Sequence, residues 1–138
     1  MPFSINTIRL ERRFVDKVFA SEFYYQRQEY FDVSKHIYDL AVMAKIDEIK
    51  KLLANPVAMT DMMAFKRHEE RARIGSDLAD KSISDFEVFK GMNENKALRD
   101  TFISMQDIYI FDDNDKIDFQ DIAALLLEIQ MSLINEII

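Results

Sequence analysis

A chain of 138 residues with 49% hydrophobic and 31% charged residues is long enough for one domain with its own core, and this balance excludes a disordered protein. Two glycines and two prolines exclude a turn-rich sheet fold, and the absence of cysteine excludes disulfides, thiolate metal sites and cysteine nucleophiles. The net charge of −7 is uneven, because residues 1–73 carry 13 basic and 11 acidic residues whereas residues 74–138 carry 5 and 14, so only the first part could face an anion. We therefore expect an all-α protein of a reducing cytoplasm, a single compact bundle of about six helices over residues 1–138.

The first half of the chain predicts long helices. Residues 5–8 could form a short extended piece. Apolar residues then recur at helical spacing, which predicts an amphipathic helix over residues 9–25. Ser34 is expected as the N-cap of the next helical stretch, whose apolar stripe continues to a stop signal at the Asn-Pro pair of residues 55–56.

The second half predicts fewer regular elements. Thr60 would cap a helix that ends near residue 75, and residues 75–93 form the least regular part of the chain. A further helix is expected over residues 94–109, followed by a turn. Asp118 is then expected as the N-cap of a last helix that runs to the end of the chain.

The C-terminal run IAALLLEIQMSLINEII is apolar enough to suggest a membrane segment. It has 17 residues and contains Glu128 and Glu136, whereas a membrane span needs about 20 apolar residues. The N-terminal residues also lack the apolar core of a signal peptide. We therefore expect no membrane association and a buried core helix with these inward-facing residues: Ile122, Leu125, Leu126, Ile129 and Leu133.

Acidic motifs in the second half do not predict a metal site. A calcium loop that begins at Asp112 would need glycine at its sixth position, where the chain has Ile117. The order Gly75-Ser76 followed by Asp85-Phe86-Glu87 imitates the metal-binding turn and acid pair of nucleotidyltransferases. That turn should follow a strand, however, and the residues before Gly75 are helical in composition. No metal ligand is predicted.

Two short stretches carry the strongest functional signal. ERRFVDKVFA, residues 11–20, and KHIYDL, residues 35–40, resemble paired motifs of the AbiEii/AbiGii nucleotidyltransferase toxin family, which are similar to R-T-F-x-E-K-x-x-A and R-[DH]-x-Y-D-L. The 22 residues between Lys17 and Asp39 also look right for this family. Asp16 stands where glutamate is usual, and Lys35 where arginine is usual. The resemblance covers the helical C-terminal part of the family, whose first half carries the Gly-Ser turn and the acid pair.

The resemblance implies a reaction and a set of residues. The family is implied to transfer a nucleoside monophosphate from an NTP to RNA such as tRNA acceptor ends, with Mg²⁺, as the toxin of abortive-infection toxin–antitoxin systems. Lys17 and Asp39 would be catalytic, and Lys17, Lys66 and Arg67 would bind the nucleotide. We expect Lys17 and Asp39 to approach each other. The implied partners are the metal-binding N-terminal half of such an enzyme or a cognate antitoxin, with RNA in the full protein, and the chain alone is expected to be inactive and to hold no cofactor.

The residues alone leave a second class of function open. Charged side chains near helix starts are commonly solvated. The acidic second half and the apolar last helix would suit a non-catalytic helical interaction module, such as an antitoxin-like or immunity protein, and a homodimer is one option for it.

Overall fold

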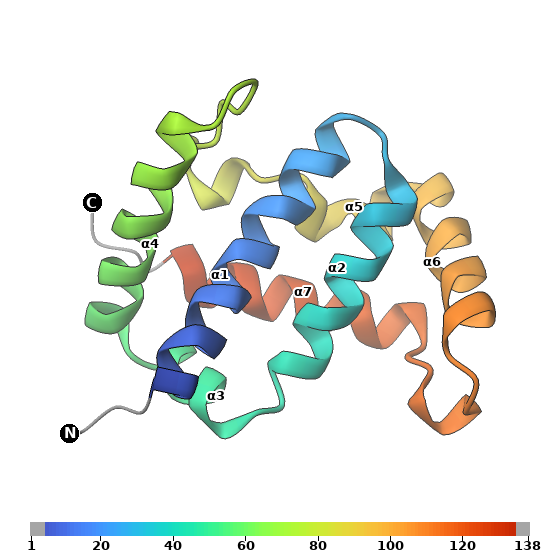
Figure 1. The fold of residues 1–138 in the computed structure, drawn as a ribbon. Helices are drawn as coiled ribbons and strands as arrows, with labels where there is room; N and C mark the ends of the chain where they lie inside the picture. Colours follow the sequence, from blue (N-terminus) through green and yellow to red (C-terminus); the bar gives the residue numbers. More distant parts are fainter. Residues whose placement is uncertain (1–4, 135–138) are drawn as a thin grey trace.

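The computed structural model describes residues 5–134, with side chains described from Leu10 onward. The expected all-α fold is confirmed: these residues form seven α-helices, with two 3-10 turns in the longer connections and no strand (Figure 1). The helices are α1 (Ile5–Gln26), α2 (Tyr30–Met43), α3 (Asp47–Leu53), α4 (Pro56–Ala72), α5 (Val88–Glu94), α6 (Lys96–Tyr109) and α7 (Phe119–Ile134), and the 3-10 turns are η1 (Ile83–Asp85) and η2 (Asp113–Asp115).

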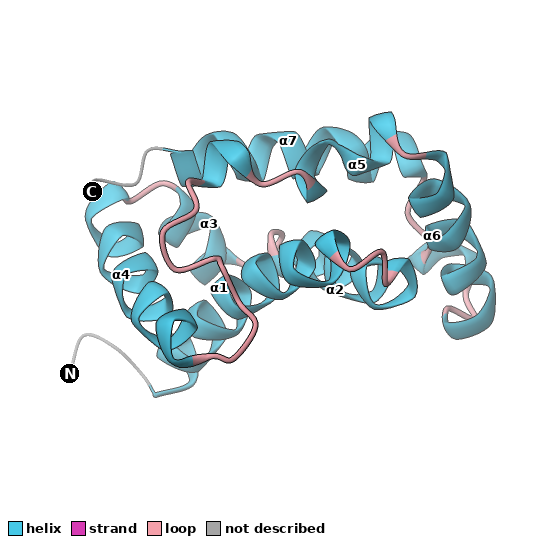
Figure 2. Ribbon diagram, turned by 90° about the horizontal axis from the view of Figure 1, so that it is seen from above, coloured by secondary structure: helices cyan, strands magenta, loops and turns pink. Residues whose placement is uncertain are grey.

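The helices form two layers that are closed at both ends. Figure 2 shows α1 and α2 side by side in one layer and α5 and α7 in the other, with α3 and α4 at one end and α6 at the opposite end. Aliphatic, methionine and phenylalanine side chains fill the space between the layers; the rings of Phe19 and Phe86 meet edge to face with centroids 5.4 Å apart. Four of the five expected core residues of α7 are buried and Leu125 is half-buried, so this helix is structural, as expected.

Several helix starts differ from the sequence-based predictions. Residues 5–8 are helical rather than extended, and residues 1–4 lie outside the described part. Ser34 lies inside α2, where its hydroxyl donates to the carbonyl oxygen of Tyr30 at 2.7 Å, so it is not an N-cap. Thr60 lies inside α4 in the same way. Asn55 is the cap of α4 and accepts from the backbone N–H of Ala58, which makes Pro56 the first residue of a helix rather than a stop.

The structure also differs from the predictions at α3 and α5 and agrees with them at the start of α7. The predicted continuous stretch up to residue 53 is broken at residues 44–46, which separate α2 from α3, and α5 lies in the segment that was expected to be irregular. Asp118 caps α7 as expected, because its carboxylate accepts from the N–H of Gln120 at 3.2 Å. No helix in the described range is both long enough and apolar enough to cross a bilayer.

Candidate functional site

The α1–α2 pair brings Lys17 and Asp39 together. The two helices are joined by three residues and run in opposite directions (Figure 1). Phe14 and Val18 of α1 are buried, as are Leu40 and Ala41 of α2, so the polar flanks of both helices lie on one side of their contact. The Lys17 ammonium Nζ lies 2.9 Å from Asp39 Oδ2, and the two side chains are 21% and 47% exposed. The predicted proximity is confirmed.

A cavity of about 270 Å³ adjoins this ion pair. Its charged residues are Arg13, Lys17 and Asp39, and its other described lining residues are aliphatic or thioether side chains: Leu10, Val42, Met43 and Ile46. Arg13 precedes Lys17 by one helical turn and is exposed. Within the described part of the chain it forms no ion pair or hydrogen bond. The site predicted from sequence therefore missed one cation, although its four-residue spacing from Lys17 was a signal for it.

Burial and nearby charges shift the pKa values of His36 and Tyr38, the two titratable ring side chains next to the ion pair. His36, one turn before Asp39, stacks on Tyr24 with ring centroids 5.7 Å apart, and its Nδ1 is buried without a hydrogen-bond partner among the described residues. Burial, followed by the charge of Lys17, lowers the pKa of His36. Burial, followed by the negative charges of Asp115 and Asp39, raises the pKa of Tyr38. Positive charge at this site therefore resides on Arg13 and Lys17 rather than on the histidine.

The other two predicted nucleotide-binding residues do not line this cavity. Lys66 on α4 contacts Asp16 at 3.1 Å and the buried carboxylate of Glu70 at 3.3 Å. Arg67 donates through Nη1 to three carbonyl oxygens of the loop after α4, those of residues 78, 79 and 81. Both side chains thus tie α4 to its neighbours, and their role in binding a nucleotide stays a prediction.

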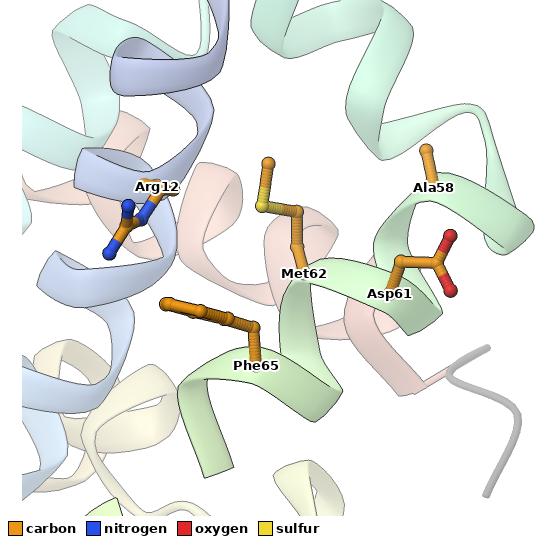
Figure 3. Close-up of a pocket in the computed structure, with 5 residues that line it drawn as sticks. All are labelled: Arg12, Ala58, Asp61, Met62 and Phe65. Carbon is orange, nitrogen blue, oxygen red and sulfur yellow. The ribbon is translucent and has the colours of Figure 1, made fainter. Parts of the chain in front are cut away.

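A second groove lies on the other side of α1. It has a volume of about 380 Å³ and lies between α1 and α4, where Figure 3 shows Arg12 of α1 reaching toward the ring of Phe65 of α4. The Arg12 guanidinium carbon lies 4.5 Å from the centroid of that ring. Three more residues of α4 complete its described lining: Ala58, Asp61 and Met62. This groove is mainly apolar and has one arginine and one acid, a composition that does not indicate a particular ligand or reaction.

The residues of the Lys17–Asp39 cavity suit a phosphate better than a metal ion. Asp39 is its one carboxylate and is already paired with Lys17. Elsewhere in the described range, no three His, Asp or Glu side chains gather closely enough to hold a metal. Asp85 lies in η1 and Glu87 at the start of α5, both exposed, so the nucleotidyltransferase-like acid pair follows a helical segment and not a strand. The magnesium implied by the resemblance therefore does not fit the residues of this cavity alone.

Comparisons with known proteins add no family and no fold relative. No family model matches the chain, and no curated protein or solved structure matches it. The interpretation of the site therefore rests on its residues and on the two motifs that contain them.

Proposed function

We propose that the Lys17–Asp39 cavity serves nucleotidyl transfer to RNA in a protein similar to the AbiEii toxins. One observation supports this most. Two motifs that lie 22 residues apart place an ammonium and a carboxylate 2.9 Å from each other, beside a cavity that a further cation lines. Ligand sites are concave and hold a few convergent polar groups, and lysine and arginine bind phosphate through charge-assisted hydrogen bonds, so a site of this composition suits a phosphate ligand.

The chemistry assigns one task to each residue. In nucleotidyl transfer, an acceptor hydroxyl attacks the α-phosphate of an NTP and pyrophosphate leaves, so catalysis depends on positioning and on neutralising negative charge. Lys17 holds the triphosphate as a point charge. Asp39 accepts the proton of the attacking hydroxyl. Magnesium, when bound, would neutralise phosphate charge, and its carboxylate ligands would have to come from outside this cavity.

The metal-binding half of such an enzyme supplies the Gly-Ser turn and the acid pair, RNA is the acceptor, and the cytoplasm is the compartment. A cognate antitoxin would block the same face. Lys66 and Arg67 act on the nucleotide only indirectly in this proposal: Lys66 fixes α4 against Asp16 of α1, and Arg67 fixes the loop after α4.

The test joins the metal-binding half of an AbiEii-family enzyme to the chain and measures incorporation of labelled NTP into total tRNA with Mg²⁺. We expect incorporation by the fusion and none by the chain alone. Lys17→Met and Asp39→Asn in the fusion should each lower the rate at least about 100-fold, the scale of a general base or of an electrostatic contact to the reacting phosphate. Lys96→Met, in an exposed ion pair on α6, is the matched control. Equal rates in the Lys17 variant and the control would refute the proposal.

A second function is favoured by the outer face of α7. Leu127, Met131 and Ile134 are exposed and recur at helical spacing, which forms an apolar stripe on a helix whose other face is buried. Such a stripe fits a non-catalytic interaction module, including a homodimer. Light scattering would detect the dimer, and Met131→Lys should then yield monomers. If the wild-type chain is monomeric, the homodimer is excluded. If its fusion also transfers nucleotide, the result favours the transferase.

A further inference from the structure

The cavity between α1 and α2 carries two cations on one helical turn. Arg13 and Lys17 are four residues apart on α1 and both line the cavity, while Asp39 is its single acid. Lys17 is paired with Asp39, and Arg13 has no partner within the described residues. The cavity therefore keeps one uncompensated positive charge, and its ligand should be an anion with more than one negative oxygen.

The rest of the lining gives no means of reading a base. The other described lining residues are Leu10, Val42, Met43 and Ile46, and they offer no ring for stacking and no side-chain amide or hydroxyl for the edge of a base. Nucleobases are recognised by stacking on aromatic rings or on arginine guanidinium planes and by hydrogen bonds to their edges, and here the one guanidinium, that of Arg13, is the group that would bind the phosphate. Charge at Arg13 and Lys17, rather than the base, should therefore decide what this cavity binds.

Asp39 already occupies the position of such an anion. The distance of 2.9 Å between Lys17 Nζ and Asp39 Oδ2 is that of a charge-assisted hydrogen bond, which a phosphate oxygen forms with a lysine equally well. Asp39 is 47% exposed and accepts no other hydrogen bond within the described residues, so its carboxylate can turn away at little cost. A phosphate and this carboxylate compete for the same ammonium.

We propose that this cavity binds the polyphosphate tail of a nucleoside triphosphate, whichever base it carries, through Arg13 and Lys17, and that the phosphate displaces Asp39 from Lys17. Binding thereby frees the carboxylate of Asp39. The identity of the anion as a nucleoside triphosphate and the use of the free carboxylate as a proton acceptor rest on the proposed function; the exchange of anions at Lys17 does not.

The test is calorimetric titration of the purified chain with inorganic tripolyphosphate, ATP, CTP and AMP at low ionic strength. Tripolyphosphate, ATP and CTP should bind within about threefold of one another, and AMP more weakly, since charge dominates. Arg13→Gln and Lys17→Met should each weaken tripolyphosphate binding about three- to tenfold, the range of one partly exposed ionic contact. Asp39→Asn should tighten it about three- to tenfold, because a competing carboxylate is removed.

Matched variants on α6 control for net charge. Lys96→Met and Asp100→Asn change the same charges in an exposed ion pair and should leave the affinity unchanged within about twofold, because solvent and salt screen distant charges. Circular dichroism melting curves verify that every variant is folded. Asp39→Ala provides a second removal of the carboxylate if the asparagine variant melts early.

Several results would overturn the inference. These are an unchanged or weaker affinity in both Asp39 variants, an unchanged affinity in Arg13→Gln, and no measurable binding of tripolyphosphate by any folded variant. ATP that binds much more tightly than tripolyphosphate would show recognition of the base, and a 5′-hydroxyl oligoribonucleotide that binds more tightly would assign the cations to an RNA backbone. The fusion assay separates the two proposals: Asp39→Asn should gain affinity and lose transfer, whereas binding without any transfer by the wild-type fusion would refute only the proposed function.

Discussion

Two of the lysine–carboxylate pairs that helix α1 makes differ in the burial and hydrogen bonding of the carboxylate. Lys17–Asp39 lies at a cavity mouth, is partly exposed and leaves Asp39 with one hydrogen bond among the described residues. Glu22 is fully buried and accepts from Lys81 Nζ at 2.7 Å, from the side chain of Gln26, and from the backbone N–H groups of Glu87 and Val88 at 2.9 Å each. A carboxylate with four donors has no remaining capacity for a ligand, whereas one with a single donor has. The number of hydrogen bonds that the carboxylate accepts therefore distinguishes the structural pair Glu22–Lys81 from the pair Lys17–Asp39, which has room for a ligand.

The contrast also shows why Glu22 is buried. The first N–H groups of a helix lack partners within that helix. At the start of α5, two of these groups donate to Glu22, a residue more than sixty positions earlier in the chain. Lys81, in the loop before η1, then neutralises the charge. The pair thus fixes the second layer of the fold onto the first.

Removal of the buried carboxylate should have the largest effect on stability. Glu22→Ala leaves the Lys81 ammonium and the two α5 N–H groups without their acceptor, which should cost about 3–5 kcal/mol of unfolding free energy. Urea denaturation monitored by circular dichroism measures it. Glu94→Ala, at an exposed position near the end of α5, is the matched control. A loss below about 1 kcal/mol, the range of exposed pairs, would show that the Glu22 network adds little to stability.

The packing around α5 should produce the next largest effect. A Cβ atom on Gly91 would lie 2.8 Å from Leu98 Cδ2 and 2.8 Å from the ring carbon Cε2 of Tyr25, closer than any real contact. Gly91→Ala should therefore cost about 1–3 kcal/mol through overpacking, although alanine favours a helix. The urea midpoint measures the change, with Asn93→Ala as an exposed control on the same helix. A gain in stability would show that Tyr25 moves away at no cost.

These two regions also mark what the sequence could and could not predict. The approach of Lys17 and Asp39 was predictable, because both lie beside apolar positions of consecutive helices joined by a short link, and packing of those positions aligns their flanks. The Glu22 network was not predictable, since its donors lie up to 66 residues away. α5 was missed for a related reason: its seven residues include Gly91, and the ring that covers this glycine comes from α1.

The predicted starts of two helices were wrong because several residues near each start are able to cap a helix. Serine, threonine and asparagine can all cap a helix, and a cap at Ser34 or Thr60 looked as suitable as one at Asn55. The apolar pattern extends upstream of Ser34 through Val33, which is buried, so the helix gains contacts by starting earlier and the serine hydroxyl turns to a carbonyl instead. Burial in the tertiary structure selects among equivalent caps.

The partly exposed pair should contribute little to stability. Lys17→Met and Asp39→Asn should each change the unfolding free energy by less than about 1 kcal/mol, because solvent screens the pair and the two side chains lose entropy when they meet. Urea curves for the two single variants and the double variant isolate the interaction between the side chains. A coupling above about 2 kcal/mol would place this pair in the class of Glu22–Lys81 and would argue against its availability to a ligand.

The smallest effect should be a change in the pH dependence of stability at His36. Burial and the charge of Lys17 lower the pKa of this histidine in the folded state, while Asp39 and Asp32 oppose the shift and Lys35 adds to it. The unfolded chain therefore binds a proton at a pH where the folded chain does not, so stability is lost as pH falls below the ordinary histidine pKa of about 6.5. His36→Gln removes this contribution and should flatten the fall in urea midpoint between about pH 7 and pH 5. His68→Gln, at an exposed position on α4, is the matched variant for the loss of a histidine. Parallel pH curves for wild type and His36→Gln would mean that the histidine beside Lys17 is protonated as readily in the folded chain as in the unfolded one, and Lys17 and Arg13 would then share their face with a third positive charge at acidic pH.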